Sequence, residues 1–228
     1  MNTVAIIQAR MGSRRLPGKS LMKVGEYTLL ETVVRSVKRN HFIDKVIVAT
    51  SNLSIDDAIE HKCQSISVEC YRGHPENVLS RFIDVSKNLN PDDIVVRVTA
   101  DNPINHRKAT QILFEEHLKQ NADYTCVENL AHTAYEFIKV DKLLSLEHNP
   151  NLDDQDKEHV TKYLREHTDQ FNVVALKPET LNINTTLDKQ LTIDTEEDYL
   201  RLKEIAEKID INHQVDMLEL YRILEEKN

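Results

Sequence analysis

Four nearly continuous apolar runs, separated by segments of helical periodicity, dominate the first hundred residues. Such runs are typical of strands that are buried on both faces of a sheet. Apolar residues that recur every three or four positions between the runs indicate amphipathic helices. This alternation predicts an α/β fold with a mostly parallel central sheet and helices on both faces. The expected strands are residues 4–7, 45–50, 68–71 and 94–99, and the expected helices are residues 29–39, 54–62 and 76–87.

The second half of the chain is less regular, but it contains no repeat or linker that would mark a domain boundary. We therefore expect a single domain over residues 1–228. The helices expected in this half are residues 106–120, 141–146, 158–166, 196–209 and 214–226. The strands expected there are residues 124–127, 135–140, 172–176 and 191–193, and a polar loop is expected at residues 149–157.

The loop after the first strand, residues 8–19, combines two glycines with four cationic side chains. Glycines let main-chain amides approach phosphate oxygens, and Arg and Lys neutralise phosphate charge. The loop is not a Walker motif, because five residues rather than four separate Gly12 from Gly18. It therefore predicts a site for a nucleoside triphosphate. The alternative is a basic surface loop after an edge strand.

Charge and cysteine content narrow the class of protein further. A formal net charge of -9 argues against a nucleic-acid partner or an anionic membrane, so the cations near the first loop favour a small anion as the ligand.

The three cysteines form no CxxC pair, which favours reduced thiols over a disulfide framework or a zinc site. No apolar run approaches the roughly 20 residues of a membrane span, and no signal-peptide pattern opens the chain. We expect a cytoplasmic protein.

Two aspartates follow apolar strand patterns and are candidate ligands for a divalent metal. Chemistry on a triphosphate commonly uses Mg²⁺, which one or two carboxylates hold together with phosphates and water. Asp101 follows the strand at 94–99, and Asp194 follows the short strand expected at 191–193. Alternatively, Asp101 caps the helix that begins near His106. Asp194 could likewise only favour the N-terminus of the next helix, where Thr195 starts a capping-box pattern.

Several motifs, in order, resemble the spore-coat-polysaccharide type of cytidylyltransferase, a relative of the CMP-sugar synthetases that activate ketodeoxyoctonate and sialic acids. The resemblance covers nearly the whole chain, and its most specific part is the first loop. The matching segments are QARMGSRRLPGK at 8–19, VATS at 48–51, YRG at 71–73, NVLSR at 77–81, DNP at 101–103, EHVT at 158–161 and TIDTEED at 192–198.

This resemblance implies a Rossmann-like nucleotidyltransferase of the nucleotide-diphospho-sugar transferase type. Such an enzyme transfers CMP from CTP, with Mg²⁺, to an acidic acceptor such as a sugar acid, phosphate or phosphonate. Pyrophosphate is released, and the product serves surface polysaccharide or related biosynthesis. We also expect a homodimer, with residues 122–195 as an acceptor-side and dimerisation subregion. The irregular strands of the second half and the last two helices could form the contact, although the amphipathic helix at 211–224 could instead pack only on the core of its own chain.

The resemblance also implies roles for individual residues. The first loop would hold the triphosphate, the strand ends the cytosine and ribose, and Asp101 and Asp194 the metal. Glu158 and His159 would reach the acceptor from the start of their helix, or would simply form its first turn. Nucleotide contacts would come from Gln8, Ala9, Arg10, Gly12, Ser13, Arg15, Lys19, Ser51, Asn52, Arg72 and Asp101. The catalytic residues would be Arg10, Lys19, Asp101 and Asp194.

The chain departs from this family in three places, and two other functions stay open. Arg14 replaces a small hydroxyl residue, Ala100 and Asn102 flank Asp101 in place of smaller residues, and residues 129–136 replace a Pro-x-Gly segment. A glycosyltransferase could use Asp154-Gln155-Asp156 as an Asp-x-Asp metal motif, although we expect this acidic loop to be solvated. A non-catalytic nucleotide-binding protein of the same fold is the other alternative.

Overall fold

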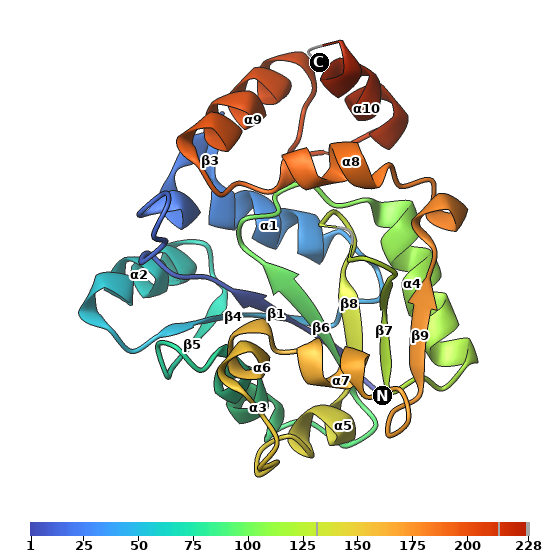
Figure 1. Ribbon diagram of the computed structural model, residues 1–228. Helices are drawn as coiled ribbons and strands as arrows, with labels where there is room; N and C mark the ends of the chain where they lie inside the picture. Colours follow the sequence, from blue (N-terminus) through green and yellow to red (C-terminus); the bar gives the residue numbers. More distant parts are fainter. Residues whose placement is uncertain (131, 214, 227–228) are drawn as a thin grey trace.

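The computed structural model describes residues 1–130, 132–213 and 215–226 and contains a seven-stranded sheet in the order β5-β4-β1-β6-β8-β7-β9 (Figure 1). Only β8 runs against its neighbours; the other strands are parallel to one another. The predicted mostly parallel sheet is confirmed. The strands are β1 (Thr3–Gln8), β4 (Lys45–Ser51), β5 (Glu69–Gly73), β6 (Ile94–Thr99), β7 (Tyr124–Val127), β8 (Glu136–Lys139) and β9 (Val173–Leu176).

The order of the strands reverses at β1, and this reversal positions the site. From β1 the chain moves outward through β4 and β5, and it then returns to pair β6 with the other side of β1. In open parallel sheets, the carboxyl ends of the strands at such a reversal leave a crevice in which ligands bind. The loop that follows β1 therefore stands at the crevice, as the sequence predicts.

Helices cover both faces of the sheet. One face packs under α1 (Leu29–Lys38), α2 (Asp57–Ser65) and α4 (Arg107–Lys119). The other lies under α3 (Val78–Ser86), α5 (Val140–Leu144), α6 (Asp154–His159) and α7 (Lys162–Glu166) (Figure 1). A third apolar cluster joins α8 (Thr185–Asp188), α9 (Glu196–Lys208) and α10 (Met217–Glu225) to Leu29 and Ile104. The last helices thus pack against the domain's own residues.

Several expected elements differ from the structure, and one is the polar loop expected at residues 149–157, because α6 begins at Asp154. Residues 158–166 are not one helix, because α6 ends at His159 and α7 begins at Lys162. Residues 191–193 are not a strand; a 3₁₀ helix, Lys189–Leu191, leads into an extended segment there. The last helix begins at Met217 and is capped by Asp216, while residues 214 and 227–228 lie outside the described part. A small hairpin, β2 (Lys23–Val24) and β3 (Tyr27–Thr28), and the 3₁₀ helices Lys19–Leu21, Ser54–Asp56 and Pro178–Leu181 complete the elements.

No helix in the described ranges is long and apolar enough to cross a membrane.

A buried histidine makes the stability of the fold depend on pH. Burial lowers the pKa of His117 to about 4, and its Nδ1 lies 2.8 Å from Oγ1 of Thr125. The unfolded chain binds the proton near pH 6.5, whereas the folded chain resists it down to about pH 4, so stability falls as pH falls through this window. The stability lost to His117 across this window reaches about 3 kcal/mol near pH 4, and none is lost at neutral pH, where the imidazole is uncharged in both states.

We expect His117→Asn to flatten this acid-side decline. The amide oxygen of Asn can accept from Thr125 but does not titrate. The measurement is the urea-unfolding free energy at several pH values between 4 and 7. Some slope should remain, because burial also lowers the pKa of His106. An unchanged slope would show that His117 does not stay neutral in the folded protein.

Candidate active site

The first loop is closed by backbone hydrogen bonds at its two ends. Gly18 has φ of 75°, a left-handed conformation that favours glycine, and its N–H donates to Met11 O at 2.8 Å. The N–H of Met11 donates to Oδ1 of Asp56 at 2.7 Å, and the Asp56 carboxylate also accepts from the Ser51 hydroxyl. The loop is therefore held against the end of β4, and Lys19 follows it in a 3₁₀ turn.

The ammonium of Lys19 lies between the two predicted metal ligands. Its Nζ is 2.8 Å from Oδ2 of Asp101 and 3.1 Å from Oδ1 of Asp194, and it donates to Ile193 O at 2.6 Å. The other carboxylate oxygen of Asp194 pairs with Arg15 at 2.7 Å. Lys19 itself is 8% exposed, so water screens these contacts only in part. The structure thus joins three distant segments of the chain at one charged centre.

Backbone contacts explain why the two aspartates meet. The N–H of Ile193 donates to the carbonyl of Asp101 at 2.9 Å, which ties the extended segment before α9 to the end of β6. The capping alternative is wrong for Asp101, whereas the capping-box pattern predicted directly after Asp194 is confirmed. The side chain of His106 caps α4, and Thr195 forms a capping box with Asp198 at α9. Asp101 and Asp194 are therefore left to face Lys19.

These residues line one cavity of about 910 Å³ at the carboxyl ends of the strands. A cavity of this size can hold a nucleotide. The walls come from the first loop, the ends of β1 and β6, the start of α3, helix α6 and Asp194. Of the residues predicted from the sequence, it brings together Gln8, Ala9, Arg10, Ser13, Arg15, Lys19, Asp101, Glu158, His159 and Asp194.

Four predicted nucleotide contacts do not line this cavity: Gly12, Ser51, Asn52 and Arg72. The guanidinium of Arg72 forms ion pairs with two carboxylates of α2. Its Nη2 lies 2.6 Å from Asp57, and its Nη1 lies 2.8 Å from Glu60. It also donates to main-chain carbonyls of the β4–α2 turn. This places Arg72 as an anchor of that turn, and its contact with cytosine stays a prediction.

Glu158 and His159 lie at the end of α6 rather than at the start of a helix. The expectation that a helix N-terminus beside them favours an anion is therefore wrong. Val160 has φ of 54° and ψ of -55°, and Thr161 N donates to His159 O at 2.5 Å, so a γ-turn separates α6 from α7. The turn leaves Glu158 in the cavity wall, with Oε1 4.0 Å from Nη2 of Arg10.

The Asp-x-Asp segment belongs to the first turn of α6. Asp156 is buried, caps this helix with Asp153, and pairs with Lys162 at 3.1 Å. The expectation that the whole segment is solvated is wrong for Asp156, although Asp154 is exposed. Because Asp156 already serves as a cap and an ion-pair partner, the two carboxylates do not form the metal site that a glycosyltransferase would need.

The structure adds cavity residues that sequence reasoning did not single out. Arg81 of α3 is 2% exposed and lines the cavity, as do Asn77 and Thr99. The one sequence signal was the segment NVLSR at 77–81, which matched the family pattern without indicating a role. Arg14, the departure from the family pattern, also lines the cavity.

Asp101 and Asp194 carry carboxylate oxygens of the kind that Mg²⁺ binds, and both contact Lys19 in this structure. Within residues 1–130, 132–213 and 215–226, no group of three His, Cys, Asp or Glu side chains could hold a metal. Two carboxylates facing one cavity suit Mg²⁺, which takes its other ligands from water and substrate phosphates. Asp101 and Asp194 would supply the protein ligands, and the ion would neutralise charge on the phosphates.

The arrangement of elements places the chain in a class of protein. It superimposes with a TM-score of 0.71 on CMP:2-keto-3-deoxy-manno-octonic acid synthetase, solved with CTP, at 16% identity, covering 92% of this chain and 100% of that one. The fold is thus that of the Rossmann-like nucleotidyltransferases. The chain belongs to the cytidylyltransferase family, whose sequence profile matches residues 4–227.

Two further proteins cover almost all of the chain. It is 35% identical over 225 residues to the spore coat polysaccharide biosynthesis protein SpsF of Bacillus subtilis, spanning 96% of this chain and 92% of that protein. A cytidylyltransferase structure from Leptospira borgpetersenii gives a TM-score of 0.85 at 27% identity, covering 100% and 95% of the two chains. The resemblance to spore-coat-type cytidylyltransferases is confirmed.

Proposed function

We propose that this cytidylyltransferase transfers CMP from CTP to an acidic acceptor, with Mg²⁺ as the metal, in surface polysaccharide or related biosynthesis. The observation that carries the proposal is the contact of Lys19 with Asp101 and Asp194 at one end of a nucleotide-sized cavity. The similarity to a spore coat polysaccharide protein supports the pathway class. Within this function, we propose the class of acceptor, the identity of the metal and the roles of single residues.

The cations of the cavity suit an in-line displacement at the α-phosphorus. An acceptor oxygen forms the new bond to phosphorus as the bond to the β-phosphate oxygen breaks, and pyrophosphate leaves with that electron pair. Mg²⁺ would neutralise phosphate charge in this step. Lys19, Arg15 and Arg10 would hold the triphosphate and stabilise the charge that develops on the leaving group. A phosphate or phosphonate oxygen attacks as an anion and has no proton to lose, whereas the hydroxyl of a sugar acid would release its proton to a base or to water as the new bond forms.

The acceptor would enter beside α6. Glu158 and His159 line the cavity there, opposite the loop cation Arg10, and Lys157 adds a positive charge to the same wall. A cation beside a carboxylate can bind an acceptor that carries both an acidic group and hydroxyls. This arrangement supports a sugar acid, a phosphate or a phosphonate as the acceptor class.

A coupled pyrophosphate assay tests the proposal. We expect pyrophosphate release from CTP that requires both Mg²⁺ and one of a panel of sugar acids, phosphorylated polyols and phosphonates. ATP, GTP and UTP serve as nucleotide controls, and EDTA removes the metal. Release that needs no acceptor would instead indicate nucleotide hydrolysis. CTP binding without any turnover across the panel would favour the non-catalytic alternative.

Three further points stay predictions. They are the homodimer, the single domain with its subregion at residues 122–195, and the cytoplasmic location. Light scattering of the purified protein measures its mass in solution and thus tests the homodimer directly. A mass near 26.4 kDa, that of one chain, would contradict the dimer.

A further inference from the structure

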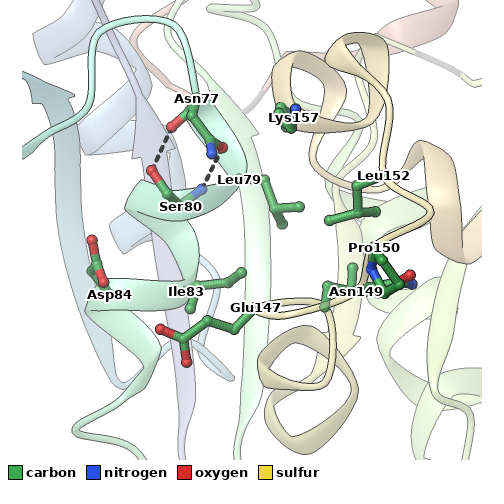
Figure 2. Close-up of a pocket in the computed structure, with 11 residues that line it drawn as sticks. Asn77, Leu79, Ser80, Ile83, Asp84, Glu147, Asn149, Pro150, Leu152 and Lys157 are labelled. Atoms are coloured by element: carbon green, nitrogen blue, oxygen red, sulfur yellow. Dashed lines mark hydrogen bonds between the residues drawn. The ribbon is translucent and has the colours of Figure 1, made fainter.

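A smaller cavity of about 300 Å³ lies between α3 and the loop after α5 and shares Lys157 with the main cavity (Figure 2). The charged side chains on its wall already have protein partners. Asp84 and Glu147 both pair with Lys87, and Lys157 pairs with Asp154 at 3.1 Å. Two reactive side chains that the proposed transfer reaction leaves unused lie on the opposite face of the sheet, beneath α2.

These side chains are the thiols of Cys63 and Cys70, and both are free. Cys63 lies in the last turn of α2 and is 0% exposed. Cys70 lies on β5, the strand at the edge of the sheet, and is partly exposed. Neither residue lines the main cavity. The pair is therefore separate from the nucleotide site.

The chain between the two cysteines folds back on itself. Only six residues separate them, and Ser67 in this segment has φ of 52°, a left-handed conformation. The N–H of Val68 donates to the carbonyl of Cys63 at 3.0 Å, so the start of the next strand is tied to the end of α2. Both cysteines are thus held by regular elements on either side of one tight turn.

The register of β5 turns the side chain of Cys70 toward α2. Cys70 is in register with Val48 of β4, and Val48 belongs to the same apolar cluster as Cys63. Tyr71, the next residue of β5, packs against the cluster on the other face, as the alternation of side chains along a strand requires. Cys70 packs against the cluster that contains Cys63, and the two thiols share a hydrogen bond.

The surroundings give the two thiols different acidities. The hydrogen bond from Cys63, with a smaller contribution from the charge of Arg72, lowers the pKa of Cys70, although burial and the carboxylate of Glu60 oppose this shift. The same hydrogen bond, together with burial, raises the pKa of Cys63. Because the thiolate is the nucleophile, Cys70 is the sulfur that reacts first, and it is also the more exposed of the two.

Cys126 provides a comparison within the same chain. It lies on β7, is 2% exposed and belongs to the cluster on the other face of the sheet, away from Cys63 and Cys70. Burial raises the pKa of Cys126 to about 12, so its thiol stays protonated at neutral pH. It therefore lacks both the acidity and the neighbouring thiol that distinguish the pair.

We propose that Cys63 and Cys70 are a redox pair that hydrogen peroxide converts into a disulfide. The Cys70 thiolate attacks a peroxide oxygen, the O–O bond breaks, and hydroxide leaves a sulfenic acid on Cys70. The sulfur of Cys63 then attacks the sulfur of Cys70. The S–S bond forms as the S–O bond breaks, and the Cys63 proton leaves with the hydroxide as water. The two thiols are oxidised by two electrons in total, and the peroxide is reduced to water.

The disulfide would fasten the last turn of α2 to β5. Arg72, two residues after Cys70, already joins these elements through its ion pairs with Asp57 and Glu60. A thiol reductant reverses the oxidation by thiol–disulfide exchange. The modification needs neither nucleotide nor acceptor, so the inference does not depend on the proposed transfer reaction.

Thiol counting by mass spectrometry tests the inference. The folded protein is treated with hydrogen peroxide, then denatured and alkylated with iodoacetamide. We expect the number of alkylated cysteines to fall from three to one, with the loss of two hydrogens from the intact mass and a peptide that links Cys63 to Cys70. Dithiothreitol should restore all three thiols. Cys126→Ala is the matched control and should form the same link.

Three alkylated cysteines after peroxide treatment would overturn the inference. A link that includes Cys126 or a second chain would overturn it as well. Cys63→Ala should prevent the link and leave a sulfenic acid on Cys70, which dimedone labels. Equal dimedone labelling of Cys70 in the unaltered protein and in Cys63→Ala would show that Cys63 does not react with it. If Cys63→Ala does not fold, Cys70→Ser, at the partly exposed position, should leave both remaining thiols reduced.

Discussion

Replacing Lys19 by Met should lower kcat/KM for CTP by roughly 10²-fold or more while the protein stays folded. The ammonium is the one protein cation within hydrogen-bonding distance of both Asp101 and Asp194 in the described residues. In the proposed reaction this group would stabilise charge on the phosphates and on the leaving pyrophosphate. Met has a similar length and fills the largely buried site without a charge.

Steady-state pyrophosphate release measures this effect, and thermal unfolding monitors the fold. Lys23→Met, at an exposed lysine on β2 four residues further along, is the matched control and should keep near-normal kinetics. Near-normal kinetics of Lys19→Met would remove Lys19 from the reaction. A large fall in the unfolding temperature with full activity per folded molecule would assign Lys19 a structural role only.

The sequence predicted the first hundred residues well, because there the local pattern and the tertiary environment agree. Strands β1, β4 and β6 are buried for most of their length, so their apolar runs appear directly in the sequence, whereas β5 at the edge of the sheet is only partly buried. The approach of Lys19 to Asp101 followed from the same reasoning, since carboxyl ends of parallel strands share one edge. The positions of these residues could be derived without knowing any contact between distant segments.

The second half was harder to predict because its structure depends on such contacts. The extended segment at residues 192–194 binds to the carbonyl of Asp101 rather than to a neighbouring strand, and no local pattern indicates this. The turn at Val160 places a β-branched residue at positive φ, where its buried side chain offsets the strain. The sequence alone predicts an uninterrupted helix at that position.

Arg81 was missed for a related reason. An arginine on a helix is most often exposed, and nothing in the local pattern marks this one as buried. Its burial depends on Gly73, which belongs to another element, and on a carbonyl of β4. Arg72 shows the converse case, because the family resemblance implied a nucleotide contact for it, whereas its guanidinium here holds the β4–α2 turn.

The largest loss of activity is expected for Asp101→Asn, on the order of 10³-fold or more in turnover, because the proposed metal ligand loses its negative charge. The amide keeps the size of the side chain, and its oxygen can still accept from Lys19, which lies 2.8 Å from Oδ2 of Asp101. The fold should therefore persist.

Two measurements separate this loss from misfolding. Pyrophosphate release gives the turnover, and the rise in unfolding temperature with Mg²⁺ and CTP reports binding at the site. Asp92→Asn, at an exposed aspartate that lies 3.7 Å from Lys139, is the control and should match the unaltered protein in both. If Asp101→Asn kept both its turnover and its Mg²⁺-dependent stabilisation, Asp101 would not be a metal ligand. If it lost turnover alone, its carboxylate would act on the substrate without holding the ion.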